Sequence, residues 1–234
     1  MKPKDKLVHI LYNGIRLKYI DPNTFESCKT LITIDLSGCE NLESIGENAF
    51  ENCTSLTSMD LSGCTNLKSI GRSAFANCSA LKNIDLLWYL ESIGENAFEN
   101  CKSLTRIDLS GCTNLKSIGR SAFANCSALK NIDLLWYLES IGENAFENCT
   151  SLTRIDLSRC TNLKSIGRSA FANCSKLKNI DLSGCVALKT IGLDAFNNCH
   201  SSSILKGVDM KILDAFEKGP KDTKEFSKMW RLAN

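Results

Sequence analysis

Residues 50–97, FENCTSLTSMDLSGCTNLKSIGRSAFANCSALKNIDLLWYLESIGENA, recur almost unchanged as residues 98–145. The two copies differ at three positions, and one of these differences replaces Ser58 with Arg106. A third copy begins at Phe146, and the copies divide again into units of 23 or 25 residues that each carry one phenylalanine at the same place. A fixed period of this length indicates a solenoid, in which each unit packs only on its neighbours because it cannot bury its apolar face alone.

Each unit follows the pattern L-x-x-I-D-L-S-G-C-x-N-L-x-S-I-G-x-x-A-F-x-N-C. Its first six residues alternate between apolar and polar, which predicts a strand with one buried face; in residues 56–61, Leu56, Met59 and Leu61 are expected to point inward. The L-x-S-I-G stretch predicts a second short extended segment that ends at glycine. The G-x-x-A-F-x-N-C stretch is expected to form one short helical or 3₁₀ turn that carries the phenylalanine into the core.

The spacing L-x-x-I-x-L-x-x-C resembles the leucine-rich repeat, and the I-G-x-x-A-F-x-N-C continuation resembles the BspA-like class of that family, over about residues 7–216. The resemblance implies an α/β repeat solenoid, a right-handed arc with a parallel β-sheet on one face and short extended, 3₁₀ or helical turns on the other. It also implies protein recognition or adhesion, with no chemistry and no cofactor.

The ends of the array are less regular than its middle. The segment Leu205-x-x-Val208-Asp209-Met210 repeats L-x-x-I-D-L, which predicts a shortened last unit whose aspartate is Asp209. After Pro220, a capping residue and a stripe of apolar side chains predict a final helix that covers the last unit. The expected organisation is a degenerate N-terminal repeat or cap (1–30), leucine-rich repeats of 23–25 residues (31–199), a shortened last repeat (200–219) and a C-terminal capping helix (220–234).

The thirteen cysteines occupy two fixed positions of the unit. No C-x-x-C pair occurs, so the ligand spacing of zinc sites is absent. Free cysteine behaves as a small apolar side chain and is often buried, so we expect two columns of buried thiols without a metal. Unpaired thiols also favour a reducing compartment. One row is Cys39, Cys64, Cys112, Cys160 and Cys185, and the other is Cys28, Cys53, Cys78, Cys101, Cys126, Cys149, Cys174 and Cys199.

Composition restricts the partners and the location. A formal net charge of +2 gives no bulk attraction to nucleic acid or to an anionic membrane. The first residues lack the apolar core of a signal peptide, and no stretch is apolar enough to span a bilayer. We therefore expect a monomer that binds no nucleic acid and inserts into no membrane. It is expected in the cytoplasm or in a host cell that it enters without a conventional signal; a surface location follows if a signal is missing from this sequence.

Outward positions of the first strand form rows along the solenoid. One row is aspartate in nearly every unit, and like charges in register repel each other. The row two residues earlier carries asparagines and two arginines, a residue type that is frequent at interfaces. Three interpretations stay open: a structural ladder in which these neighbours offset the aspartates, a stripe that docks a partner, and a calcium column. The predicted partner-binding residues are Arg106, Asp108, Asn131, Asp133, Arg154 and Asp156.

Two units replace the polar turn with L-W-Y-L, which places Trp88, Tyr89, Trp136 and Tyr137 on one edge. Tryptophan and tyrosine are over-represented at binding hot spots, but bulky side chains also fill the space that a shorter turn leaves. Both interpretations stay open, and the four aromatic residues join the predicted partner-binding set. On the opposite face, two rows alternate in charge up to their last members, which we interpret as register control: Glu43, Lys68, Glu91, Lys116, Glu139, Lys164, Lys189 and Glu47, Arg72, Glu95, Arg120, Glu143, Arg168, Leu193.

No catalytic constellation emerges from the sequence. The only histidines are His9 and His200, one in each terminal region, and every cysteine belongs to a row. We predict a non-catalytic protein–protein interaction module that binds a protein partner through the repeat sheet and its edge. The alternatives are a structural or adhesive repeat array that acts by multivalency, and an engineered repeat scaffold with no natural ligand.

Overall fold

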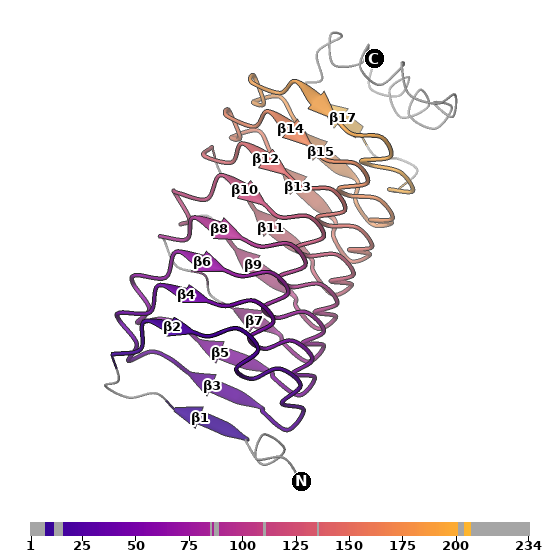
Figure 1. The fold of residues 1–234 in the computed structure, drawn as a ribbon. Helices are drawn as coiled ribbons and strands as arrows, with labels where there is room; N and C mark the ends of the chain where they lie inside the picture. Colours follow the sequence, from indigo (N-terminus) through magenta and orange to yellow (C-terminus); the bar gives the residue numbers. More distant parts are fainter. Residues whose placement is uncertain are drawn as a thin grey trace.

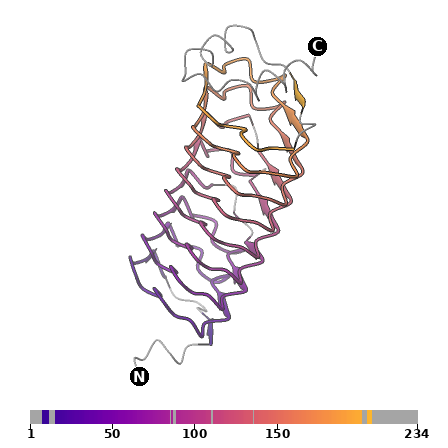
Figure 2. The ribbon, with the colours of Figure 1, turned by 90° about the vertical axis from the view of Figure 1, so that its right-hand side faces the viewer.

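The structure, a computed structural model, describes residues 8–11, 16–84, 86, 89–109, 111–134, 136–200 and 204–206. Its seventeen short strands pair in parallel, and equivalent strands of successive units lie side by side along one elongated stack (Figure 1). Figure 2 shows the same units from the side as closely spaced layers. The predicted parallel-strand solenoid is confirmed.

Two rows of strands run along the solenoid. The first sheet contains β1 (His9–Leu11), β3 (Thr33–Asp35), β5 (Ser58–Asp60) and β7 (Asn83–Ile84), followed by β9 (Arg106–Asp108), β11 (Asn131–Asp133), β13 (Arg154–Asp156), β15 (Asn179–Asp181) and β17 (Ile204–Lys206). Its two ladders meet between β7 and β9, where the Thr105 amide donates to the Lys82 carbonyl at 3.1 Å. The second sheet is continuous and contains β2 (Tyr19–Ile20), β4 (Ser44–Ile45), β6 (Ser69–Ile70), β8 (Ser92–Ile93), β10 (Ser117–Ile118), β12 (Ser140–Ile141), β14 (Ser165–Ile166) and β16 (Thr190–Ile191).

The G-x-x-A-F-x-N-C stretches, for which the sequence predicted short helical or 3₁₀ turns, form non-helical turns that stack on one another. No helix occurs in the part of the chain that the structure describes, so the expected helical turns and the α/β class are wrong there. Asn96 and Asn100 adopt the left-handed backbone conformation, with φ of 56° and 59°. The amides of Asn96, Phe98 and Asn100 therefore donate to carbonyls of the next unit at 2.8, 2.7 and 2.9 Å. Alternation between local and inter-unit hydrogen bonds replaces the continuous pattern that a helix needs.

Glycine follows each second-sheet strand from β4 to β16, where successive units approach closely. A Cβ atom at any glycine of this column would lie 2.3–2.7 Å from backbone atoms of the preceding unit. Contacts this short do not occur between real atoms, so another residue requires the two units to move apart. The column comprises Gly46, Gly71, Gly94, Gly119, Gly142, Gly167 and Gly192.

The core repeats one contact along the whole array. The predicted phenylalanine row is fully stacked, with centroids of adjacent rings 5.0–5.4 Å apart and ring planes within 13° of parallel. Leu56, Met59 and Leu61 are buried, as the alternation predicted. Stacked rings add about 0.5–1.5 kcal/mol per pair beyond the area they bury, so the column links every unit to its neighbours. Its members are Phe25, Phe50, Phe75, Phe98, Phe123, Phe146, Phe171 and Phe196.

Both cysteine rows lie inside the solenoid as free thiols, twelve of them buried and Cys199 half-buried. The Cys78 thiol donates to the carbonyl of Phe50 at 3.1 Å, and the same contact recurs along the row. Cysteine suits this position because it is small and still carries a weak donor. Burial raises the pKa of the Cys126 thiol to about 12, so the reactive thiolate is scarce at neutral pH.

We therefore expect a thiol reagent to react with almost no cysteine in the folded protein and with thirteen after denaturation. The half-buried Cys199 is expected to react first. Titration before and after unfolding, on protein prepared without an oxidant, measures both numbers. Rapid labelling of several thiols in the native state would contradict the burial of the two rows.

The last unit has a different register from the one predicted. Strand β17 pairs Leu205 with Ile180 and Lys206 with Asp181, so lysine and not Asp209 follows the aspartate row. Leu205 and Val208 are both apolar and three residues apart, so either fits the inward position in the sequence pattern. Asp209 and the capping helix expected over residues 220–234 lie outside the described residues, and the structure gives that helix no support.

Candidate interaction surface

The six predicted residues of the first sheet lie on three adjacent strands. Pairing of β9 with β11 sets Asn131 beside Arg106 and Asp133 beside Asp108, and pairing of β11 with β13 sets Asp133 beside Asp156. Arg106, Asn131 and Arg154 are exposed, whereas the isoleucine that follows each of them is buried. The structure thus brings these six residues together on three adjacent strands.

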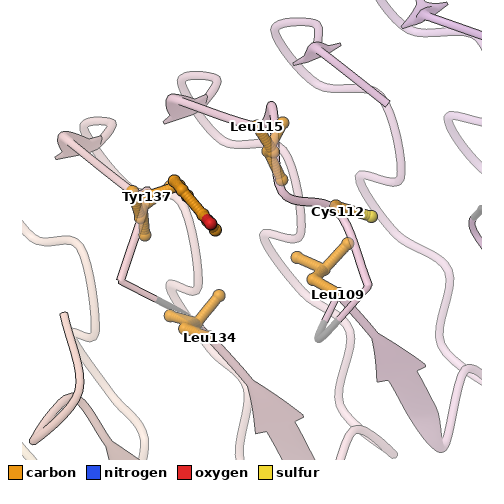
Figure 3. A pocket seen from close by; sticks show the side chains of 6 residues that line it. Leu109, Cys112, Leu115, Leu134 and Tyr137 are labelled. Carbon is orange, nitrogen blue, oxygen red and sulfur yellow. The ribbon is translucent and has the colours of Figure 1, made fainter. Parts of the chain in front are cut away.

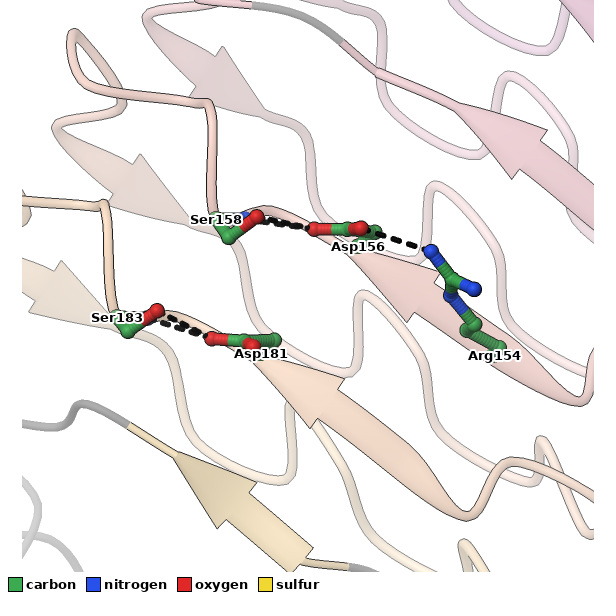
Figure 4. A network of polar contacts seen from close by, with 5 residues as sticks. All are labelled: Arg154, Asp156, Ser158, Asp181 and Ser183. Atoms are coloured by element: carbon green, nitrogen blue, oxygen red, sulfur yellow. Dashed lines mark hydrogen bonds and ion pairs between the residues drawn. The ribbon is translucent and has the colours of Figure 1, made fainter.

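Four aspartates of the row accept a hydrogen bond from the amide of the serine two residues later and so close the turn after their own strands: Asp35, Asp60, Asp156 and Asp181. Asp156 accepts hydrogen bonds from the Ser158 amide at 3.0 Å and from its hydroxyl at 2.6 Å, and Asp181 binds Ser183 in the same way (Figure 4). The hydroxyl and amide of Ser158, together with Arg154, hold the pKa of the Asp156 carboxyl below its usual range. This side-chain turn is a frequent use of aspartate. It gives the aspartate row a structural role that sequence reasoning missed, although the D-L-S spacing signals it.

The two arginines bind aspartates of their own strands. Arg106 Nη2 lies 2.7 Å from Asp108 Oδ2, and Arg154 Nη2 lies 2.8 Å from Asp156 Oδ2. Both arginine side chains remain about two-thirds exposed, at 65% and 66%. Exposed ion pairs contribute only about 0–1 kcal/mol. The contacts therefore hold each guanidinium along the strand without making it part of the core, and its other N–H groups remain able to bind a partner.

Trp136 and Tyr137, in the second of the two L-W-Y-L turns, lie in different environments. Tyr137 is 38% exposed and lines a hollow with Leu109, Cys112, Leu115, Leu134 and Leu138, between this short turn and the longer turn of the preceding unit (Figure 3). Tyr137 therefore fills part of the space that the shorter turn leaves. Trp136 is 54% exposed and packs on Tyr137 with ring centroids 5.2 Å apart, so its indole faces solvent.

The equivalent turn one block earlier is less fully described. Tyr89 is 53% exposed, and Trp88 lies outside the described residues. Trp136 follows β11 after two residues, so the exposed indole lies at the carboxyl edge of the sheet that carries Arg106 and Arg154. The first sheet therefore carries exposed arginines on β9 and β13 and an exposed tryptophan in the turn that follows β11.

Some of the alternating charges next to the second sheet form ion pairs between neighbouring units. Glu43 pairs with Lys18 at 3.1 Å and Lys68 with Glu91 at 3.9 Å, and Lys164 also pairs with Glu139. In the neighbouring row of Glu47 and Arg72, all described members lie more than 4 Å from an opposite charge. The predicted row began at Glu43, but the structure extends it by one unit to Lys18. The pairs are exposed, so they favour the correct register only weakly.

The described part of the chain contains neither a metal-binding group of side chains nor a helix that could span a membrane. No group of three His, Cys, Asp or Glu residues there is arranged to hold a metal ion. His9 Nδ1 lies 2.6 Å from the Thr33 hydroxyl at the first strand of the array. None of the described segments forms a helix that is long and apolar enough to cross a bilayer.

Similarity to known proteins agrees with this geometry. The sequence matches the BspA-type leucine-rich repeat region, in six copies, over residues 7–114 and 91–215. A crystal structure of the leucine-rich repeat protein of T. pallidum is similar, with 26% identity and a TM-score of 0.64, over 74% of this chain and 78% of that chain. A leucine-rich cell surface protein from Faecalibacterium prausnitzii shares the fold, with 20% identity and a TM-score of 0.53, over 94% of this chain and 90% of the other.

No curated protein matches the sequence. The family match covers most of the chain, and repeats of this kind typically mediate protein interaction or adhesion and are generally not enzymes. The buried leucine, isoleucine, phenylalanine and cysteine rows are the same positions that define the repeat pattern. The chain belongs to the BspA-type leucine-rich repeat family.

Proposed function

We propose that the chain is a non-catalytic module that binds a protein partner through the outward face of β9, β11 and β13 and the adjoining aromatic turn. The observation that supports this most directly is the exposed indole of Trp136, which lies in the turn after β11, in the same sheet whose strands β9 and β13 carry the exposed Arg106 and Arg154. Tryptophan and arginine are the residue types most enriched among binding hot spots. Tyr137 packs against the indole of Trp136 and is a positioning residue in this proposal.

The cysteines do not decide where the module works. Sequence reasoning favoured a reducing compartment because the thiols are unpaired, but twelve of them are buried, where oxidants reach them poorly. The cytoplasmic, host-delivered and surface locations are therefore all compatible with the thiol rows. A protein partner and a monomeric module remain part of the proposal.

A site-specific cross-link tests the proposed surface. A photoreactive amino acid at position 136, or at Asn131, is expected to give one saturable adduct with a partner protein. The same group at Lys116, which is exposed beside the second sheet, is the matched control and is expected to give none. Adducts between copies of this chain would instead favour the adhesive array, and equal adducts from all three positions would refute the proposed surface.

A further inference from the structure

A strip without carboxylates follows the side of the solenoid where the strands of the first sheet begin. Six consecutive units contribute one six-residue segment each, and these segments contain seven Lys or Arg residues and no Asp or Glu. The whole chain has a formal net charge of only +2, so positive charge is concentrated here. The segments are residues 53–58, 78–83, 101–106, 126–131, 149–154 and 174–179, and we call their lysines, Lys82, Lys102, Lys130, Lys176 and Lys178, the lysine strip.

Backbone hydrogen bonds hold these segments in one column. The Thr105 amide donates to Lys82, the Lys130 amide to Thr105, and the Lys178 amide to Thr153, each at 3.1 Å. Lys82, Lys130 and Lys178 thus recur every second unit, and stacked parallel strands set such positions about 10 Å apart. The backbone thus holds a row of lysine positions along the side of the solenoid.

The lysine strip is not neutralised by the protein. All five of its lysines are exposed, and none of them forms an ion pair with a carboxylate in the described part of the chain. Arg106 and Arg154, in contrast, already bind Asp108 and Asp156. Free ammonium groups in a line raise the local concentration of an anionic ligand.

Carboxylates border the strip on both sides. The aspartates of the first sheet end its strands, and a glutamate precedes the buried cysteine by two residues in alternate units. Partial burial and the charge of Glu51 raise the pKa of the Glu99 carboxyl. A ligand must therefore be a narrow anionic chain, because a wide polyanion would also meet these two rows. The bordering residues are Asp60, Asp108, Asp156, Asp181, Glu51, Glu99 and Glu147.

We propose that the lysine strip binds a linear sulfated polysaccharide. The exposed or half-buried side chains of the six segments are lysine, arginine, threonine, serine, asparagine and alanine, and the polar ones suit sulfate groups and sugar hydroxyls. Protein interfaces are enriched in aromatic anchors and poor in lysine and serine, and single-stranded nucleic acids need aromatic stacking platforms. The strip has no aromatic residue. The ammonium groups bind sulfate oxygens, and hydroxyl and amide groups bind the sugar ring substituents.

Heparin, as a sulfated polysaccharide, is the probe, and unsulfated hyaluronate is its comparison. We expect the full chain to bind heparin with an affinity that falls steeply with salt. The variant Lys82→Gln/Lys130→Gln/Lys178→Gln should bind at least about tenfold more weakly, and its log–log salt slope should fall by about three, one per lysine. A matched variant, Lys68→Gln/Lys116→Gln/Lys189→Gln, removes the same charge elsewhere and should bind as tightly as the unchanged protein.

Three lysine-to-arginine substitutions at 82, 130 and 178 should keep heparin binding, which separates loss of charge from loss of folding. Equal weakening by the two glutamine variants would overturn the proposal, and so would equal affinity for hyaluronate. Competition by duplex DNA or polyglutamate as strong as that of heparin would also overturn it, because the strip would then select only charge. The tested lysines lie outside the proposed protein-binding surface, so either proposal can fail without the other.

Discussion

Replacing Gly63 with arginine is expected to lower the free energy of unfolding by about 3 kcal/mol or more. A Cβ atom at Gly63 would lie 1.6 Å from the carbonyl oxygen of Ser37 in the preceding unit. The two S-G-C turns stack directly, so any side chain there forces the units apart. Thermal or denaturant unfolding of the variant measures the loss.

Gly111→Arg is the matched control for this substitution. The unit before Gly111 has the short turn Leu86–Leu90, which is two residues shorter than the S-G-C turn that opposes Gly63. The chain itself carries Arg159 at the corresponding position of the next copy, again after a short turn. We expect Gly111→Arg to cost less than about 1 kcal/mol. Equal losses for the two variants would contradict the proposed stacking of the turns.

Phe123→Ala is expected to destabilise the protein by about 3–5 kcal/mol. The Phe123 ring is fully buried and stacks on Phe98 at 5.2 Å and on Phe146 at 5.3 Å, so its removal leaves a cavity in the middle of the ring column. Because repeat proteins are stabilised mainly through contacts between neighbours, the loss should also broaden the unfolding transition. Calorimetry measures both effects.

Phe196→Ala supplies the comparison at the end of the column. Phe196 stacks on one neighbour, Phe171, among the rings that the structure describes. We expect a smaller loss and a transition as sharp as that of the unchanged protein. A loss at Phe123 no larger than that at Phe196 would argue against a continuous column that links the units.

Rows of identical residues made the interior predictable from the sequence. The positions of Phe123 and Cys126 in the unit are invariant, and any solenoid with this period must stack such positions. The inward face of residues 56–61 followed from alternation alone, because a strand turns successive side chains to opposite faces. These features depend on periodicity, which a single sequence shows completely.

The features that sequence reasoning missed depend on contacts between units or on local turn chemistry. The turn around Asn96 and Phe98 makes helix-like local bonds, and only stacking on the next unit supplies acceptors for the alternate amides. The sequence leaves three roles open for Asp156, whereas the structure shows it bound to Ser158, two residues away, and to Arg154 of its own strand. Inter-unit backbone hydrogen bonds leave no mark in the sequence pattern, whereas the D-L-S spacing does signal the hydrogen bond between Asp156 and Ser158.

The interior of the solenoid provides stability, and we propose that its outer face provides binding. Arg106→Ser/Arg154→Ser tests this separation, because serine already stands at the equivalent Ser58. Asp156 keeps its bonds to Ser158 without the arginine, and an exposed pair contributes only about 0–1 kcal/mol. Arg120→Ser/Arg168→Ser removes the same charge beside the second sheet and is the control.

The decisive measurement is the yield of the partner adduct cross-linked at position 136, recorded together with the melting temperature of each variant. We expect Arg106→Ser/Arg154→Ser to lose most of the adduct while its melting temperature changes by no more than about 2 °C, and we expect the control to keep both values. A clear fall in melting temperature with an unchanged adduct yield would contradict this expectation, because the arginines would then stabilise the sheet and bind nothing.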